Sequence, residues 1–228
     1  MLVVFGVIFF LSLGQWQLER AAYKEEIQQK FESRLKQDYQ ALPSGFSLND
    51  GVANELLFRK LILEGRYDNA HSFLLDNQVH GGKAGYHVLT PLQLKDSDRI
   101  ILVNRGWVEI GASRQRLPEI PRLQGTGRVS GTLSVPQRSA FQLGKVALAD
   151  NWPQVIPFID FDALRQQYSD GLLPMILWLA PEQEGSFVRV WKPVWMKPEK
   201  SRAYATQWFA FALIACVLFV FLNLRKVE

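Results

Sequence analysis

The hydrophobic positions of this sequence gather at its two ends. Residues 203–224 contain no charged residue. As a helix rising about 1.5 Å per residue, this run covers roughly 33 Å, enough to cross a bilayer core of about 30 Å. Tyr204 and Trp208 lie at its start, where membrane helices carry aromatic residues. The pattern predicts a transmembrane helix over residues 203–224, followed by a short tail over residues 225–228.

The first 15 residues form a second, shorter apolar run. No charge occurs before Glu19, but Met1–Leu13 as a helix covers only about 20 Å. A cleaved signal peptide is the alternative, and it would need basic residues at its start and a cleavage site with small residues. The sequence offers neither, so we expect an uncleaved transmembrane helix over residues 1–15, which a start codon further upstream would lengthen.

The chain between the two runs predicts one extramembranous domain over residues 16–202. Residues 16–40 keep helical spacing up to Pro43-Ser44-Gly45, and from Leu56 onward apolar and polar residues alternate. Turn residues separate the alternating stretches. The predicted strands are residues 56–64, 71–79, 86–94, 99–108, 128–135, 141–149, 175–179 and 187–191; the predicted turns are 81–82 and 96–98, the loop 111–124 and the short helix 158–168. We therefore expect an α+β domain of mainly antiparallel β-structure, a small barrel or sandwich.

Composition and motifs exclude several kinds of chemistry. The net charge is +4, and Cys216 is the single cysteine, so a disulfide framework or a cysteine-based metal site cannot form within the chain. No G-x-S-x-G or H-E-x-x-H motif occurs, and His71, His80 and His87 do not have metal-ligand spacing. We expect no enzymatic activity, no bound metal ion and no nucleic-acid partner.

Tryptophans are concentrated in the last part of the chain. Trp178, Trp191, Trp195 and Trp208 alternate there with basic residues and prolines. They fit a domain core and an interfacial aromatic girdle, and they also fit an apolar platform for a flat ligand such as a haem. The sequence leaves both interpretations open.

Four stretches together resemble the Surfeit locus protein 1 family, the biogenesis factors of cytochrome c oxidase. They are GQWQLER at 14–20 with Lys24, GYHVLTP at 85–91, ILVNRGWV at 101–108 and YATQWFAFA at 204–212. The resemblance implies two membrane helices, a non-enzymatic role in assembling a haem-copper oxidase, and assistance in inserting haem a into its catalytic subunit. A haem-binding or haem-sensing domain without an oxidase partner is the rival function.

The resemblance also suggests a haem-binding region before the last helix. Some bacterial members are thought to bind haem a through a histidine at the position of Ser201, so this chain departs from that pattern at the axial ligand. Lys200 and Arg202 could pair with haem propionates because both are basic and near the membrane surface. With Tyr204 and Trp208, these residues are our candidate haem contacts.

The candidate partner-binding residues are Trp16, Arg20, Arg105, Trp107 and Gln207. Each has a structural alternative: Trp16 and Arg20 can anchor the helix at the bilayer surface, and Arg105 can cap backbone carbonyls. We favour structural roles for Asn104 and Gly106, with Gly106 at a bulge or a positive φ.

Two arguments about topology disagree. The basic residues that flank the apolar runs are more numerous on the domain side, which favours a cytoplasmic domain. That rule weakens for a loop much longer than about 60 residues, and the family resemblance implies an outward-facing domain. We therefore expect a multi-pass protein of the bacterial inner membrane, with its domain in the periplasm and the tail at residues 225–228 as a cytoplasmic tail. No targeting presequence precedes Met1, which favours a bacterium over a mitochondrion.

Overall fold

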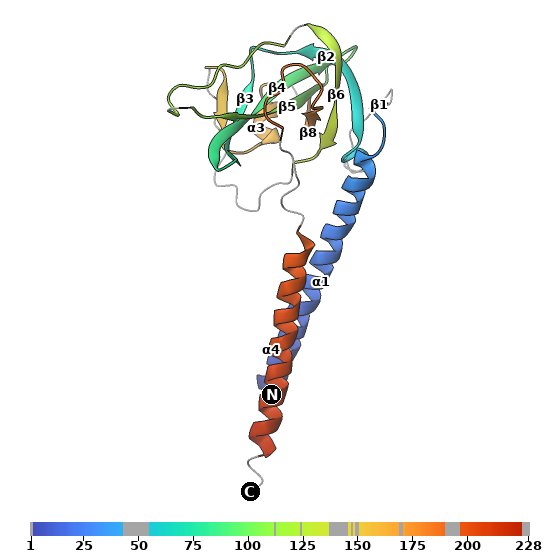
Figure 1. The fold of residues 1–228 in the computed structure, drawn as a ribbon, viewed down its shortest axis with the longest axis vertical. Helices are drawn as coiled ribbons and strands as arrows, with labels where there is room; N and C mark the ends of the chain where they lie inside the picture. The colour runs from blue at the N-terminus through green and yellow to red at the C-terminus, as the bar shows by residue number, and fades with distance from the viewer. Residues whose placement is uncertain are drawn as a thin grey trace. The chain divides into compact units, whose positions relative to one another are not determined.

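The structure is a computed structural model that describes residues 2–42, 55–111, 113–123, 125–136, 146, 148, 151–168, 171–189 and 197–224. The chain forms two compact units (Figure 1). One unit comprises residues 1–33 and 192–228, and the other comprises residues 34–191. The predicted domain boundaries at residues 15/16 and 202/203 stay a prediction. The first helix, however, passes through residue 16 without a break.

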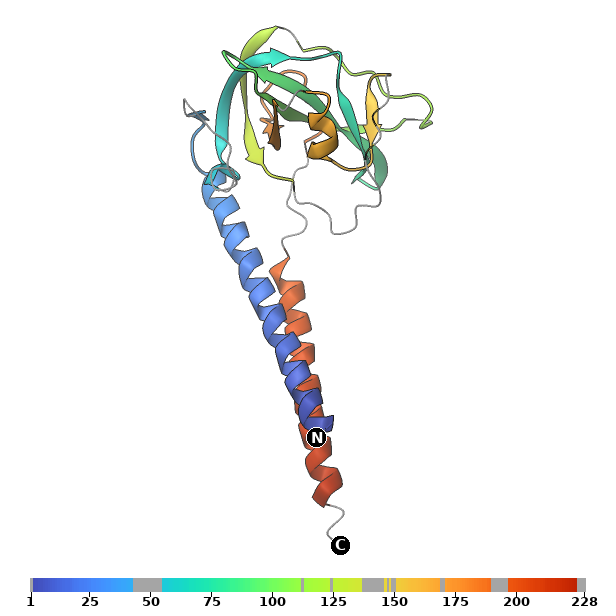
Figure 2. The same ribbon diagram turned by 180° about the vertical axis from the view of Figure 1, so that it is seen from behind.

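Two long helices make up the first unit. Helix α1 runs from Leu2 to Leu35, and helix α4 runs from Pro198 to Leu224 (Figures 1 and 2). Among the described residues, α4 alone is long and apolar enough to cross a membrane by length and composition. The predicted continuation of the first helix to Gln40 is wrong: α1 ends at Leu35, and Gln40–Ala41 form the short strand β1 beside β2.

The second unit is built on a closed β-barrel. Its strands are β2 (Lys60–Tyr67), β4 (Lys83–Leu94), β5 (Ile100–Glu109), β6 (Thr126–Ser134) and β8 (Leu172–Leu179). They pair in the order β2–β6–β8–β5–β4, and β4 pairs with β2 again, which closes the ring (Figure 1). Strand β3 (Phe73–His80) pairs with β4, and β7 (Gln154–Ile156) pairs with β3. Closure removes unpaired edges from the ring.

Most of the predicted strands are present, but the pairing is more mixed than expected. Within the part of the chain that the structure describes, three pairs are parallel: β1 with β2, β3 with β7, and β5 with β8. The β5–β8 pair joins strands that lie far apart in the sequence, and a local pattern of alternation carries no information about such a pair. Alternation also missed β1 and β7, which have only two and three residues.

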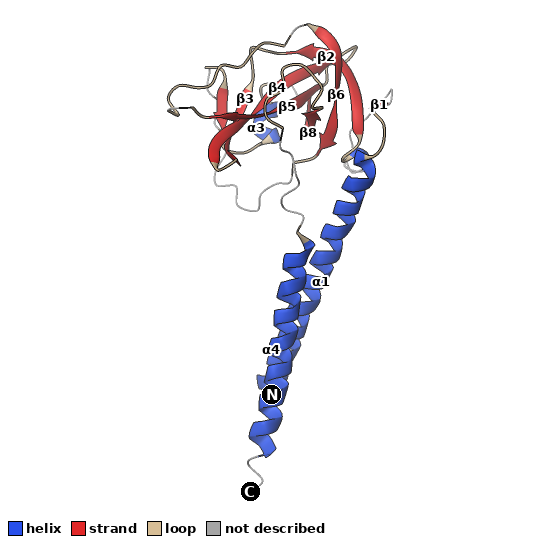
Figure 3. Cartoon of the chain, in the orientation of Figure 1, coloured by secondary structure: helices blue, strands red, loops and turns tan. Residues whose placement is uncertain are grey.

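The predicted helix over residues 158–168 is shorter in the structure. Helix α3 covers Phe161–Arg165, because the Asp160 carboxylate accepts hydrogen bonds from the backbone amides of Asp162 and Ala163 and so begins the helix. Figure 3 shows α3 as the short helix within the strand-rich unit. Some predictions lie outside the described residues: the helix end at 43–45, most of the strand at 141–149, Trp191, Trp195 and the tail at 225–228. Of the predicted strand 187–191, Val188 forms an isolated bridge to Trp107.

Among the described residues, three hydrophobic clusters stabilise the barrel unit, and the smallest contains Leu74, Tyr86 and Val88. Leucines of β2, β6 and β8, including Leu61, Leu133 and Leu177, fill the barrel interior. The second cluster lies between β3, β7, β8 and α3, around Phe73, Ile156 and Leu164. Alternation of buried and exposed residues along β2 follows from its position in the barrel wall.

Candidate functional site

Helices α1 and α4 pack closely through small residues and aromatic rings. A Cβ on Gly14 would lie 2.5 Å from the Phe209 ring, so only glycine permits this approach. The Phe10 ring centroid lies 5.9 Å from the rings of both Trp208 and Phe211. Ala21, Ala205 and Ala212 are also buried. Small residues at such positions let membrane helices approach each other.

Two polar contacts join the same helices near the start of α4. Lys24 Nζ donates a hydrogen bond to Ser201 Oγ over 2.9 Å, and Arg202 forms an ion pair with Glu25. Gly14 faces Phe209, whereas Lys24 faces Ser201, so residue numbers rise on α1 as they fall on α4. The helices are therefore antiparallel, and both change from apolar to charged at a similar level.

Some of the candidate haem contacts already interact with α1, and others are exposed. Ser201 is 3% exposed and faces α1 through its bond to Lys24, and Arg202 is paired with Glu25. Tyr204 is 53% exposed and Lys200 is also exposed. Trp208 is half-buried against Phe10. The region therefore has a polar contact between the helices and an outer face that remains uncovered.

On the same helix pair, three candidate partner-binding residues are exposed. Trp16 is 48% exposed, and the Arg20 guanidinium lies 5.4 Å from the centroid of its ring. Gln207 is exposed on α4. An aromatic ring and a cation at this spacing suit a membrane surface or a protein partner.

The remaining candidates, Arg105 and Trp107, belong to the barrel unit, where both are buried. Arg105 is 0% exposed; its Nε donates to Gly185 O (3.1 Å) and its Nη2 to Pro121 O (2.8 Å). Its guanidinium also lies 5.2 Å from the Phe187 ring centroid. Arg105 thus caps backbone carbonyls, one of the two interpretations left open above, and a partner cannot reach its side chain in this conformation.

Trp107 is 7% exposed and packs against Gly85, near the start of β4. Its Nε1 donates to Gln78 O over 3.0 Å. A Cβ on Gly85 would lie 2.2 Å from that indole nitrogen, so the glycine of the GYHVLTP stretch leaves room for the tryptophan of the ILVNRGWV stretch. Two of the motifs are therefore structurally linked.

Asn104 and Gly106 shape the same part of β5. Gly106 has a φ of 115°, and its amide donates to Asn104 Oδ1 over 2.9 Å. Because Oδ1 accepts this bond, Nδ2 faces His87 and donates to its Nδ1 over 2.8 Å. The expected structural roles of both residues are confirmed.

Burial shifts the pKa values of three side chains in the barrel unit. Burial lowers the pKa of His87 to about 4, against the opposing effect of its bond to Asn104, so the ring is neutral at physiological pH. Burial also lowers the pKa of Arg105 to about 10, although Tyr67 opposes the shift, and it raises that of Tyr67 to about 12. Within the described part of the chain, no three histidine, cysteine or carboxylate residues gather in a way that could hold a metal ion.

Comparison with known sequences decides the family. Residues 4–213 match the sequence profile of the SURF1 family. The chain belongs to this family. The resemblance based on the four stretches is thereby confirmed, and the match includes the helix pair as well as the barrel.

Individual relatives match this family member to different extents. A SURF1-like protein of Dictyostelium discoideum is 37% identical over 109 residues, which cover 46% of this chain and 40% of that protein. A SURF1-like protein of Monosiga brevicollis is 24% identical over 225 residues, covering 93% of this chain and 82% of that protein. Cytochrome oxidase assembly protein SHY1 of Saccharomyces cerevisiae is 26% identical over 111 residues, or 46% of this chain and 28% of that protein. The chain thus matches less than half the length of two of these three relatives.

Sequence reasoning missed the partners of several candidates. Lys24 was identified only as part of a motif and Glu25 was not a candidate, yet both contact α4. Glu25 follows Gly14 by eleven residues, about three helical turns, and this spacing was an available signal for a shared helix face. The distant partners of Arg105, at Pro121 and Gly185, had no such signal.

Proposed function

We propose that this chain is a membrane-anchored assembly factor for cytochrome oxidase, with the oxidase catalytic subunit as its partner. The observation that carries the proposal is the similarity to the yeast protein named cytochrome oxidase assembly protein SHY1, within a shared family. The long apolar helix α4 supports a membrane location. On this proposal the chain acts by binding and positioning and has no enzymatic activity.

We propose further that α1 and α4 both span the inner membrane of a bacterium, over residues 1–15 and 203–224, with the barrel in the periplasm. The antiparallel packing of Gly14 on Phe209 supports a second span, because it sets the apolar half of α1 beside the apolar half of α4. The contact of Lys24 with Ser201 supports a common membrane boundary for both helices. A reporter enzyme fused after Glu228 tests this topology: activity in the cytoplasm is expected, and activity in the periplasm contradicts it.

The proposed contribution to haem is assistance in inserting haem a into the catalytic subunit. Exposed Lys200 and Tyr204 support a contact with the propionates and edge of a haem at the membrane surface. Arg202 and Trp208 would join that contact from positions already engaged with α1. Trp16, Arg20 and Gln207, exposed on the helix pair, are the proposed contacts for the partner, and the membrane surface is the alternative contact of Trp16 and Arg20. We do not propose axial ligation by residue 201, because Ser201 is buried against Lys24.

Deletion of the gene tests the assembly role. We expect a lower haem a content of the oxidase, measured from its absorption spectrum, while copper centres of other enzymes are unchanged. Complementation with the wild-type gene serves as the control, and a strain free of any second family member removes redundancy. Normal oxidase spectra and activity in that deletion strain would contradict the proposal.

Purification in mild detergent separates the assembly role from its rival. Copurified oxidase subunits, identified by mass spectrometry, are expected for an assembly factor. A bound haem with no oxidase subunit would instead favour a membrane-tethered haem-binding or haem-sensing protein.

A further inference from the structure

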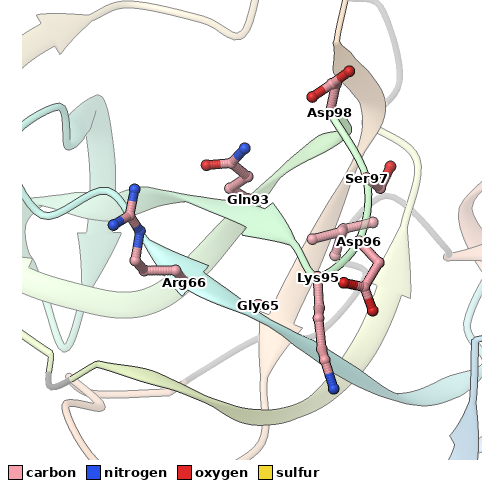
Figure 4. A pocket seen from close by; sticks show the side chains of 8 residues that line it. Gly65, Arg66, Gln93, Lys95, Asp96, Ser97 and Asp98 are labelled. Carbon is pink, nitrogen blue, oxygen red and sulfur yellow. The ribbon is translucent and has the colours of Figure 1, made fainter.

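A polar hollow lies on the barrel where β2 meets β4 (Figure 4). It has a volume of about 490 Å³, and residues 65–66 of β2, residues 93–94 of β4 and the turn at residues 95–98 line it. Neither the four motif stretches nor the helix pair contributes to it, so it is separate from the sites considered above.

The floor and wall of the hollow are held in place by close packing and hydrogen bonds. A Cβ on Gly65 would lie 2.4 Å from Gln93 O, so the two strands approach each other as closely as glycine permits. The turn is closed by the hydrogen bond from Leu94 N to Arg99 O (2.9 Å) and by the one from Arg99 N to Ser97 Oγ (3.1 Å). The hollow is therefore formed before any partner binds.

The charged residues around the hollow fall into two groups. Glu64 pairs with Lys95 over 3.2 Å and with Arg128 over 3.5 Å, so these three residues already have ion-pair partners, with one carboxylate shared by two cations. Arg66, Asp96 and Asp98 are exposed and have no side-chain partner among the residues that the structure describes. Figure 4 shows Arg66 on one side and the two carboxylates on the other, with Gln93 between them.

This arrangement restricts what can bind. Leu94 is the single hydrophobic side chain of the lining, so a small apolar ligand or cofactor would bury little of its surface. Two uncompensated carboxylates repel a polyanion, and Arg66 at the other side repels a purely basic segment. A polypeptide segment with a basic and an acidic side chain complements both sides, and the amide of Gln93 can bond to its backbone.

We propose that the hollow is the docking site for such a segment of the partner protein, with a basic side chain at Asp96 and Asp98 and an acidic side chain at Arg66. The identity of that partner as an oxidase subunit rests on the proposed function; the charge pattern of the segment does not. Ion pairs at an open surface are screened by salt, so the complex should weaken as ionic strength rises.

Photocrosslinking of the full-length protein in its membrane tests the proposal. A benzoylphenylalanine in place of Gln93 is expected to crosslink one protein, through a peptide that carries both charges. Arg66→Glu, and separately Asp96→Lys with Asp98→Lys, should each lower the crosslinking yield by about tenfold. Glu119→Lys is the matched control, since Glu119 is exposed and lies outside the hollow, and it should leave the yield unchanged.

The outcomes separate the two proposals. Yields that are equal in the charge-reversal variants and the control overturn the docking site, as does a yield no higher than that of the same probe in place of exposed Gln115. Equal unfolding temperatures show that the variants are folded. A charge-dependent crosslink to a protein outside the oxidase supports the docking site and contradicts the oxidase as partner.

Discussion

At the scale of single residues, buried polar side chains explain most of the VNRGWV stretch. Asn104 donates a hydrogen bond to His87 and accepts one from the backbone amide of Gly106. Gly106 has a positive φ, a backbone conformation that residues with a Cβ rarely adopt. Arg105 connects β5 to two segments without regular secondary structure, at Pro121 and Gly185. These residues act first on the fold, and any effect on a partner comes through the surface that they stabilise.

The two interpretations of Arg105 predict different results for Arg105→Lys. An ammonium group cannot reach both carbonyls that the guanidinium bonds, so we expect a loss of about 2 kcal/mol in the free energy of unfolding. Denaturant unfolding measures this loss, with Arg122→Lys at an exposed position as control. Unchanged stability with loss of copurified oxidase would instead assign Arg105 to partner binding.

The buried histidine predicts a pH dependence of stability. The pKa of His87 is about 4 in the folded protein and about 6.5 in the unfolded chain, so the unfolded chain binds the extra proton between these values. Stability should therefore fall as the pH drops from 6.5 to 4, by up to about 3 kcal/mol. His87→Asn keeps an acceptor for Asn104 but cannot titrate. Its unfolding temperature should depend less on pH over this range, and an equal dependence would contradict the assignment.

At the scale of elements, the close approach of α1 to α4 at Phe209 depends on Gly14. In Gly14→Leu the new side chain occupies the space of the Phe209 ring, so the helices must separate and we expect a destabilised helix pair. Trp208 fluorescence during titration with a denaturing detergent follows this separation. Phe209→Ala should partly restore the packing in the double variant.

Gly6→Leu provides the matched control for that experiment. Gly6 lies on the same helix, but a Cβ there meets no atom within 4 Å. If α1 and α4 separate equally in both leucine variants, the added hydrophobic bulk explains the destabilisation and the contact with Phe209 does not.

The strands and helices differ in how well local sequence predicts them. Strands β2, β3, β4, β5, β6 and β8 all overlap predicted strands. Along β2 the side chains alternate between buried and more exposed positions, whereas β5 and β8 are buried on both faces, so continuous apolar runs mark those two strands. The short strands β1 and β7 exist only through pairing with β2 and β3, which local alternation cannot show. Asp160 shortened α3 through a capping bond that the helical pattern alone did not reveal.

At the scale of the whole molecule, the chain consists of two units with separate kinds of packing. The barrel unit has its own hydrophobic clusters, and the helix unit is held by contacts such as Phe10 with Trp208. We expect two thermal transitions in mild detergent: the near-UV circular dichroism of the barrel is lost while the far-UV helical signal remains.

A core substitution assigns the two transitions. Phe73 is 0% exposed in the barrel unit, so Phe73→Ala should lower that unit's stability by about 3–5 kcal/mol and leave the helical transition in place. A single transition in which both signals disappear together would show that the units unfold as one.

The sequence by itself determined the terminal apolar runs, most strands and the family, because hydrophobic periodicity and motif order are local properties of the chain. Tertiary structure decided the parallel β5–β8 pair, the carbonyls bonded by Arg105 and the contact of Lys24 with Ser201. Each of these contacts joins residues far apart in the sequence. Its geometry therefore depends on how the whole chain folds and which side chains become buried, and a local pattern does not contain that information. For the same reason Ser201, chosen as the position of a family ligand, is a helix contact in the folded protein.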